Sequence, residues 1–253
     1  MNLKPRVHIA EQYFVLSTKQ ASNGRVFWRH RDNPNPAFHA QLFDPAWLKQ
    51  NHCIVNSASA GRGSTHFLRV DDSQLVLRQY RRGGLVRSIS DESYIWTGLK
   101  RTRAWREFDV LEKLEQHALA APRPYACMVI KTKLSYTASL ITYFLPGTTL
   151  AEHICTGNLS SETWYAIGQR IRQFHDLGVY HADLNAHNIL IDEQGTVTLI
   201  DFDRAKFISP NARWTNSNLS RLKRSLNKIG SSGPVSYDQT SWQVLIEGYK
   251  SST

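Results

Sequence analysis

The sequence predicts an α+β protein of two lobes, in which a β-rich N-terminal lobe precedes a shortened, mainly helical C-terminal lobe. Short β-prone runs dominate residues 54–80, whereas apolar residues recur at helical spacing later in the chain. The dipeptide Pro146-Gly147 separates the β-prone region from the helical one. We therefore predict an N-terminal lobe over residues 1–145 and a C-terminal lobe over residues 146–253, with a ligand cleft between them.

The N-terminal lobe is expected to be a sheet that carries one long helix. Residues 1–50 show no clear period, and we interpret them as an irregular extension. Apolar residues recur every three positions from Trp105 to Leu114, which predicts a helix over residues 103–118. The polar turn at residues 71–73 joins the first two expected strands. The expected strands are residues 65–70, 74–80, 127–133 and 138–145.

The C-terminal lobe is expected to be helical around one small hairpin. Apolar residues from Trp164 to Leu177 line one face of a helix, and Gly178 stands where a C-cap belongs. Residues 189–192 and 196–202 read as two short strands around a tight turn. From about Asn218, the tail contains two candidate amphipathic helices. The order of elements is thus strands first and helices second.

The chain is basic and has few cysteines. Its 31 Lys and Arg exceed its 21 Asp and Glu, so the formal charge is 31 − 21 = +10. Such a surface favours nucleic acid, acidic lipid headgroups or phosphorylated substrates as partners. The three cysteines form no CxxC pair and are expected to be reduced thiols. No apolar run approaches the roughly 18–20 residues that span a bilayer, so we expect a cytosolic or peripheral protein.

The strongest signal for function is the segment HADLNAHN, residues 181–188, followed by LIDFD, residues 199–203. Phosphoryl transfer from ATP needs a carboxylate at the attacking hydroxyl and a metal ion that neutralises the phosphate oxygens. Asp183 can supply the carboxylate, while Asn188 and Asp201 offer oxygen ligands for Mg²⁺. Asp and Asn are also common turn residues. The ordered combination, with an apolar strand after each element, favours catalysis.

This arrangement resembles a known superfamily. HxDxxxxN, an apolar strand, a turn and DF together form the catalytic signature of protein-kinase-like enzymes, and the resemblance covers residues 54–208. The version HADLNAHNIL…LIDFD in a short basic chain resembles the lipopolysaccharide kinase family, and within it the kinases of 3-deoxy-D-manno-octulosonic acid (Kdo). The segment LRQYRRGG, residues 77–84, supports this resemblance.

The resemblance implies a bilobal protein-kinase-like fold that binds ATP and Mg²⁺. It makes Asp183 the catalytic base and His181 the structural histidine of the catalytic loop. Asn188 and Asp201 become the metal ligands. The implied nucleotide-binding residues are Gly61 and Gly63 in a loop over the phosphates, Glu107 as the partner of a phosphate-binding cation, and the backbone from Tyr143 to Leu145 at adenine.

Several positions depart from the superfamily pattern. Arg78 occupies the place of the usual lysine, and its planar fork binds phosphate differently from a point charge. Arg78 could instead be a solvated strand residue, and Glu107 a helix-surface carboxylate. The glycine loop lacks a third glycine and could be a simple hairpin turn. Asp203 replaces the glycine of DFG, and Asn185 replaces the basic residue that protein kinases place two positions after the base.

The tail and the basic residues bear on the acceptor. Only about fifty residues follow Asp201, and they contain no APE motif, which disfavours a peptide substrate. Leucines at helical spacing after residue 218 alternate with basic residues, so this helix either lies on an anionic membrane or packs on the lower lobe. The candidate acceptor-binding residues are Arg81, Arg82, Arg101 and Arg103.

The resemblance implies transfer of the ATP γ-phosphate to the 4-hydroxyl of Kdo on a lipid A precursor, in lipopolysaccharide core biosynthesis. It places the protein peripherally on the cytoplasmic side of a bacterial inner membrane. Two alternatives stay open. One is another small-molecule phosphotransferase, although the +10 charge disfavours cationic antibiotics. The other is a non-catalytic kinase-like scaffold for anionic ligands; no nucleic-acid motif is found, and no nucleic-acid partner is expected.

Overall fold

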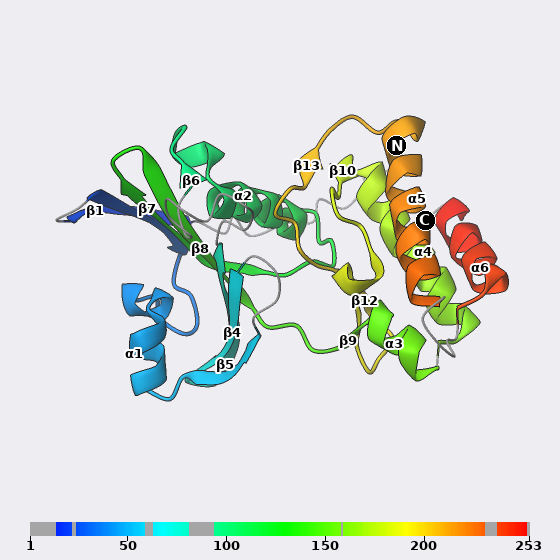
Figure 1. Cartoon of the computed structure of the whole chain (residues 1–253), viewed down its shortest axis with the longest axis horizontal. Coiled ribbons are helices and arrows are strands. Elements are labelled where there is room, and N and C mark those ends of the chain that lie inside the picture. Colours follow the sequence, from blue (N-terminus) through cyan, green and yellow to red (C-terminus); the bar gives the residue numbers. More distant parts are fainter. Residues whose placement is uncertain are drawn as a thin grey trace, which may run out of the picture. The chain divides into compact units, whose positions relative to one another are not determined.

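An antiparallel sheet organises the first part of the chain. The computed structural model describes residues 14–21, 24–58, 63–80, 94–157, 159–230 and 237–251. Within these ranges, eight strands pair in the order β1-β2-β7-β8-β5-β4-β3, with the short β6 beside β8 (Figure 1). The strands are β1 (Phe14–Ala21), β2 (Gly24–Arg31), β3 (Ile54–Ala58), β4 (Gly63–Val70), β5 (Ser73–Tyr80), β6 (Tyr94–Ile95), β7 (Pro124–Thr132) and β8 (Ser135–Tyr143).

The expectation of an irregular extension over residues 1–50 is wrong for its described part. Two long strands, β1 and β2, lie there, followed by η1 (Ala40–Phe43) and α1 (Pro45–Gln50). Strand β2 shows no alternation because both of its faces carry aromatic rings. Phe27 stacks on Trp96 with ring centroids 5.9 Å apart, whereas Trp28 packs against the core on the other face. Helix α1 has ordinary start signals, an Asp44 N-cap and Pro45.

The two faces of the sheet are covered by different elements. On one face, Leu75 and Leu77 of β5 belong to a buried core with Leu42 and Leu48 from the η1–α1 segment. The opposite face of the sheet carries Arg78 and the other β5 residues that alternate with these leucines along the strand. This face meets α2 (Arg103–Gln116), as the Arg78–Glu107 contact shows. The strand therefore presents its polar functional side chains to a helix rather than to the apolar core.

The second part of the chain is helical. It contains α3 (Leu150–Thr156), α4 (Ser161–Asp176), α5 (Ala212–Gly230) and α6 (Gln239–Lys250). Helices α4 and α6 approach so closely that a Cβ at Gly168 would lie 2.0 Å from the Leu245 carbonyl oxygen. The short strands are β9 (Thr148–Thr149), β10 (Val179–Tyr180), β11 (Ile189–Ile191), β12 (Val197–Leu199) and β13 (Lys206–Phe207), and η3 (Ala186–Asn188) precedes β11.

The predicted elements agree with the structure apart from their ends. The helix expected at 103–118 is α2, and the helix ending before Gly178 is α4, with Gly178 in the left-handed conformation at φ +73°. Both tail helices are present, although α5 begins at Ala212, earlier than expected. No helix in the described ranges is long and apolar enough to cross a membrane. The chain has the α+β architecture of a kinase-like fold.

The chain divides into two compact units near the expected boundary. The first unit comprises Met1–Phe108 and Pro124–Phe144, and the second comprises Asp109–Arg123 and Leu145–Thr253. The later part of α2 and the segment after it thus group with the helical unit. The sequence offered no reason to divide α2, because its apolar period continues without interruption.

His175 is a buried titratable group in the helical unit. Its side chain lies between α5 and α6, where Nδ1 is 2.9 Å from the Tyr249 hydroxyl and the ring packs edge-on against Trp214. The residue is 3% exposed, and burial lowers its pKa from 6.5 to about 4. The folded protein therefore holds a neutral imidazole over a pH range in which the unfolded chain takes up a proton.

We expect the free energy of unfolding to decrease as the pH falls from 6.5 towards 4. Because the folded-state pKa lies below the unfolded value, the contribution of His175 is complete above pH 6.5 and is lost on acidification, up to about 3 kcal/mol. Urea denaturation at a series of pH values measures this slope. His175→Gln should flatten it, whereas His117→Gln, at an exposed position, should not. Equal slopes in the wild type and His175→Gln would contradict the assignment.

Candidate active site

The segment 181–188 forms a loop whose side-chain amides hold the backbone of Asp183. The Nδ2 atoms of Asn185 and Asn188 donate to the Asp183 carbonyl oxygen at 3.0 and 2.9 Å. The Oδ1 atom of Asn185 accepts the His187 N–H at 2.9 Å. The side chain of Asp183 is 61% exposed. The loop is therefore closed through its backbone while the carboxylate stays accessible to a ligand.

His181 connects the two halves of the motif. Its Nε2 lies 2.9 Å from the carbonyl oxygen of Ile200, and its Nδ1 accepts the backbone N–H of Asp183 at 3.2 Å. A carbonyl can only accept, so the ring proton is on Nε2 and the imidazole is neutral. Burial lowers the pKa of His181, which is 2% exposed, and favours this neutral form. This position suits the structural role predicted for His181.

Asp201 lies directly after the residue that His181 binds. Its φ of +65° is in the left-handed region, which costs conformational energy for a residue with a side chain. The next residue, Phe202, is 1% exposed and stacks on Phe174 with ring centroids 5.7 Å apart. The buried phenylalanine therefore anchors the strained turn that carries Asp201.

Asn188 is linked to the same turn through its backbone. Its carbonyl oxygen accepts the Ile200 N–H at 3.0 Å. Because its side-chain Nδ2 donates to Asp183, the side-chain oxygen Oδ1 is the atom that can ligate a cation. The structure thus ties the loop of Asp183 and Asn188 to the strand that leads to Asp201.

The donor set of this loop suits a hard cation. In the described ranges, no group of three or more His, Cys, Asp or Glu side chains is placed to hold a metal ion. Mg²⁺ does not need such a group, because it usually binds one or two protein oxygens together with phosphate oxygens and water. One carboxylate from Asp201 and one amide oxygen from Asn188 fit that requirement.

The predicted cation–carboxylate pair is present in the first unit. Nη2 of Arg78 lies 2.8 Å from Oε2 and 3.1 Å from Oε1 of Glu107. The Tyr80 hydroxyl also donates to Oε2 of Glu107. Glu107 is only 2% exposed, so it is not an ordinary helix-surface carboxylate, and Arg78 is not simply a solvated strand residue. A buried carboxylate with two donors holds its cationic partner in a defined place.

Tyr80 is a residue of this network that sequence reasoning missed. It lies two positions after Arg78 on the same face of β5, and that period-two relation was the available signal. Arg103, predicted to bind the acceptor, lies against the same tyrosine. Its Cζ is 5.0 Å from the Tyr80 ring centroid, and its Nη1 is 2.5 Å from the Tyr94 hydroxyl. Arg103 is thus part of the aromatic surroundings of the Arg78–Glu107 pair.

The other predicted positions are more scattered. Gly61, Arg81 and Arg82 lie outside the described residues. Gly63 begins β4 opposite Tyr80, and Arg101 ends the short η2 (Leu99–Arg101). Tyr143 ends β8 in the first unit, whereas Leu145 begins a segment of the second unit. Between them, the Phe144 N–H donates to the Gln74 carbonyl at 2.9 Å, so this amide is already used within the sheet.

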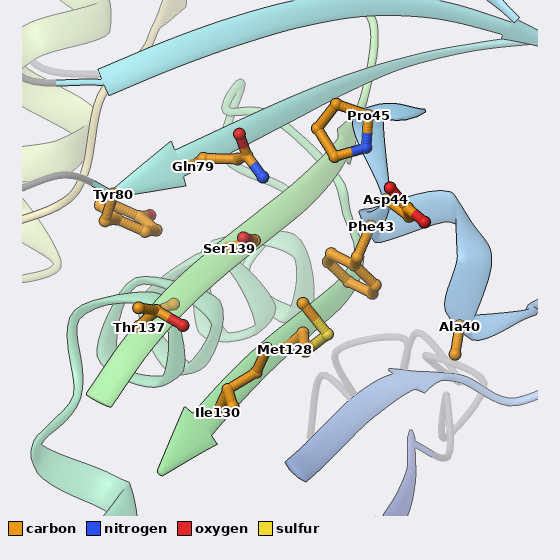
Figure 2. Close-up of a pocket in the computed structure, with 11 residues that line it drawn as sticks. Ala40, Phe43, Asp44, Pro45, Gln79, Tyr80, Met128, Ile130, Thr137 and Ser139 are labelled. Atoms are coloured by element: carbon orange, nitrogen blue, oxygen red, sulfur yellow. The ribbon is translucent and has the colours of Figure 1, made fainter. Parts of the chain in front are cut away.

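A pocket of about 330 Å³ lies in the first unit (Figure 2). Figure 2 shows it between the η1–α1 segment and strands β5, β7 and β8. Phe43 of η1 lines it, and so does one face of the sheet, where Met128 and Ile130 of β7 lie opposite Ser139 and Thr137 of β8. None of the predicted site residues lines it, although Tyr80 stands at its border.

The fold and the site together define a protein-kinase-like phosphotransferase. A sheet carries a cation paired with a buried helix carboxylate, and a separate loop, linked through its backbone to the turn of Asp201, presents an exposed aspartate and the predicted metal ligand Asn188. The chain matches the Lipopolysaccharide kinase (Kdo/WaaP) family over residues 45–249 and belongs to that family. It is therefore a kinase, an enzyme that transfers a phosphoryl group from ATP.

Three relatives show how far the similarity extends. A Photobacterium profundum protein named 3-deoxy-D-manno-octulosonic acid kinase is 38% identical over 209 residues, covering 82% of this chain and 88% of that protein. A Vibrio cholerae protein of the same name is 40% identical over 212 residues, covering 83% and 89%. A third, from Xylella fastidiosa strain M23, is 38% identical over 208 residues, covering 82% and 83%.

Removing the Tyr80 hydroxyl should weaken the Arg78–Glu107 network. Tyr80→Phe deletes a donor to a buried carboxylate, which costs about 1.5–3 kcal/mol in the free energy of unfolding. The same variant should raise the KM for ATP, because Glu107 then holds Arg78 less firmly. Denaturant titration and ATP-dependent kinetics measure the two effects. Tyr165→Phe, on the exposed side of α4, is the matched control. A Tyr80→Phe protein as stable as this control would contradict the proposed role.

Proposed function

We propose that this kinase transfers the γ-phosphate of ATP to the 4-hydroxyl of Kdo on a lipid A precursor. The observation that carries the proposal is the HADLNAHN loop, which exposes the Asp183 carboxylate while its backbone is tied to the turn of Asp201. Support for the acceptor comes from relatives named as Kdo kinases, which align with over four-fifths of the chain.

Each polar residue of the site has a task in this reaction. Asp183 orients the attacking hydroxyl and accepts its proton. Asn188 and Asp201 hold Mg²⁺, which when bound neutralises charge on the phosphate oxygens. Arg78, positioned by Glu107, binds phosphate oxygens of ATP through its planar fork. His181 stays neutral and maintains the distance between the loop and the Asp201 turn.

The acceptor is an anion, and the surface of the chain suits it. Helix α5 carries exposed basic side chains at Arg221, Arg224 and Lys228. Its apolar side is occupied, because Leu222 and Leu226 are fully buried. These leucines therefore support packing of the helix in its unit rather than insertion into lipid. Contact with a membrane would be electrostatic, worth about 1 kcal/mol for each basic residue near an anionic surface. We propose that the enzyme lies peripherally on the cytoplasmic face of the inner membrane, and the exposed basic side chains of α5 support an electrostatic contact there.

Changing either aspartate should strongly impair transfer. Asp183→Asn keeps the shape of the side chain but removes the proton acceptor, so kcat should fall by about 10²–10⁴-fold. Asp201→Asn removes the charged metal ligand, and its activity should show a steep loss at low Mg²⁺. The assay uses labelled ATP, Mg²⁺ and a Kdo-bearing lipid A precursor beside panels of sugars, peptides and aminoglycosides. Asp176→Ala, a surface change on α4, is the control. Near-normal turnover in Asp183→Asn, or transfer to other acceptors only, would reject the proposal.

Membrane association can be tested independently of catalysis. The protein should co-sediment with vesicles containing phosphatidylglycerol and should stay in solution with phosphatidylcholine alone. Binding should weaken as salt is raised towards 0.5 M, because exposed charges are screened. Arg224→Glu with Lys228→Glu should weaken binding further, because two exposed positive charges become negative. Binding that is equal on both vesicle types would argue against an electrostatic contact.

A further inference from the structure

Helix α5 contacts the loop of Asp183 at three points along one face. The Oδ1 atom of Asn218 accepts the His181 N–H at 3.3 Å, and the Oγ atom of Ser225 accepts the Ala186 N–H at 3.2 Å. Between them, Nη1 of Arg221 lies 3.7 Å from Oδ1 of Asp183. Spacings of three and four residues place Asn218, Arg221 and Ser225 on the same side of the helix. The helix thus carries one cation opposite the predicted base.

The Arg221–Asp183 contact does little for stability. The two side chains are 44% and 61% exposed, and such exposed pairs contribute about 0–1 kcal/mol. The 3.7 Å separation also exceeds the roughly 2.7–2.9 Å of a charge-assisted hydrogen bond. Arg221 is therefore brought to this position by the hydrogen bonds of Asn218 and Ser225 rather than by its attraction to Asp183.

A cation at this position supplies positive charge that the loop itself lacks. Residues 181–188 contain no lysine or arginine, and their two histidines, His181 and His187, lack the permanent charge of a guanidinium. Negative charge builds up on the transferred phosphoryl oxygens, and an arginine supplied from another segment is an effective way to stabilise it. A guanidinium also binds a carboxylate or phosphate through two parallel hydrogen bonds.

We propose that Arg221 is an oxyanion-binding residue of the reaction centre. Its guanidinium leaves Asp183 when substrates bind and contacts an oxyanion beside the attacking hydroxyl. That oxyanion is either the transferring phosphoryl group or the carboxylate of the acceptor sugar. The proposal rests on the proposed function, because it assumes that Asp183 acts at the acceptor hydroxyl. It adds a residue from a distant helix to the site.

The test compares Arg221→Ala, Arg221→Lys and Arg213→Ala. Arg213 is exposed near the start of the same helix and provides a control that removes the same charge. In Arg221→Ala, kcat/KM with the Kdo-bearing acceptor should fall at least about 100-fold, consistent with loss of an arginine at a phosphoryl-transfer site. The kcat/KM of Arg221→Lys should lie between those of the wild type and Arg221→Ala, because an ammonium keeps the charge but lacks the planar fork of a guanidinium. Millimolar guanidinium should partly restore the activity of Arg221→Ala. The urea-denaturation midpoints of the three variants should equal that of the wild type.

Two arms of the experiment identify the oxyanion. If Arg221 binds the phosphoryl group, kcat falls both with the acceptor and in ATP hydrolysis without acceptor. If it binds the acceptor carboxylate, the KM for the acceptor rises and ATP hydrolysis is unchanged. Wild-type kinetics in Arg221→Ala, or losses equal to those of Arg213→Ala, overturn the proposal. A wild-type enzyme that is inactive on Kdo rejects the proposed function instead. Arg221 is then tested with whichever acceptor of the panel the wild type phosphorylates, and kinetics of Arg221→Ala equal to those of Arg213→Ala with that acceptor overturn its role.

Discussion

The candidate active site of this kinase depends on one buried neutral imidazole. His181 donates to the carbonyl before Asp201 and accepts from the amide of Asp183, so a single ring links the backbone at the predicted base to the backbone at the predicted metal ligand. Neither bond survives a change of tautomer, and the second is lost on protonation. Burial, which lowers the pKa of His181, therefore also protects the geometry of the site. The remaining contacts of the loop reinforce this arrangement.

The loop is held from two sides, and this rigidity suits electrostatic catalysis. Within the loop, two asparagine amides converge on one carbonyl oxygen, while outside it Asn218 and Ser225 of α5 satisfy two loop N–H groups. Polar groups that are fixed before the reaction need no reorganisation when charge develops. The positive φ of Asp201 has a conformational cost, and the stacked, buried Phe202 beside it offsets that cost through packing. The surrounding core thus maintains a turn that its own sequence disfavours.

Site residues could be predicted from the sequence where they lie close together in the chain. Positions 181–188 and 201 carry their chemistry in a fixed order, so their types and spacing were sufficient to predict the loop. Arg221 was missed as a site residue because it reaches Asp183 from a distant helix, and only tertiary structure brings the two together. Tyr80 was missed although it shares a strand face with Arg78, because its bond to Glu107 on α2 is visible only in the structure. The strands β1 and β2 were missed for another reason: aromatic residues on both faces of β2 hide the period-two signal.

The pairing of Arg78 with Glu107 is better explained by function than by stability. Removing two charges from water has a large desolvation cost, and apolar replacements of buried pairs are often as stable or more so. Here the carboxylate is almost fully buried, yet it accepts hydrogen bonds from Arg78 and from the Tyr80 hydroxyl. A guanidinium that replaces a lysine has a planar shape and must be oriented as well as placed. The second donor restrains the carboxylate, and the restrained carboxylate then orients the fork of Arg78.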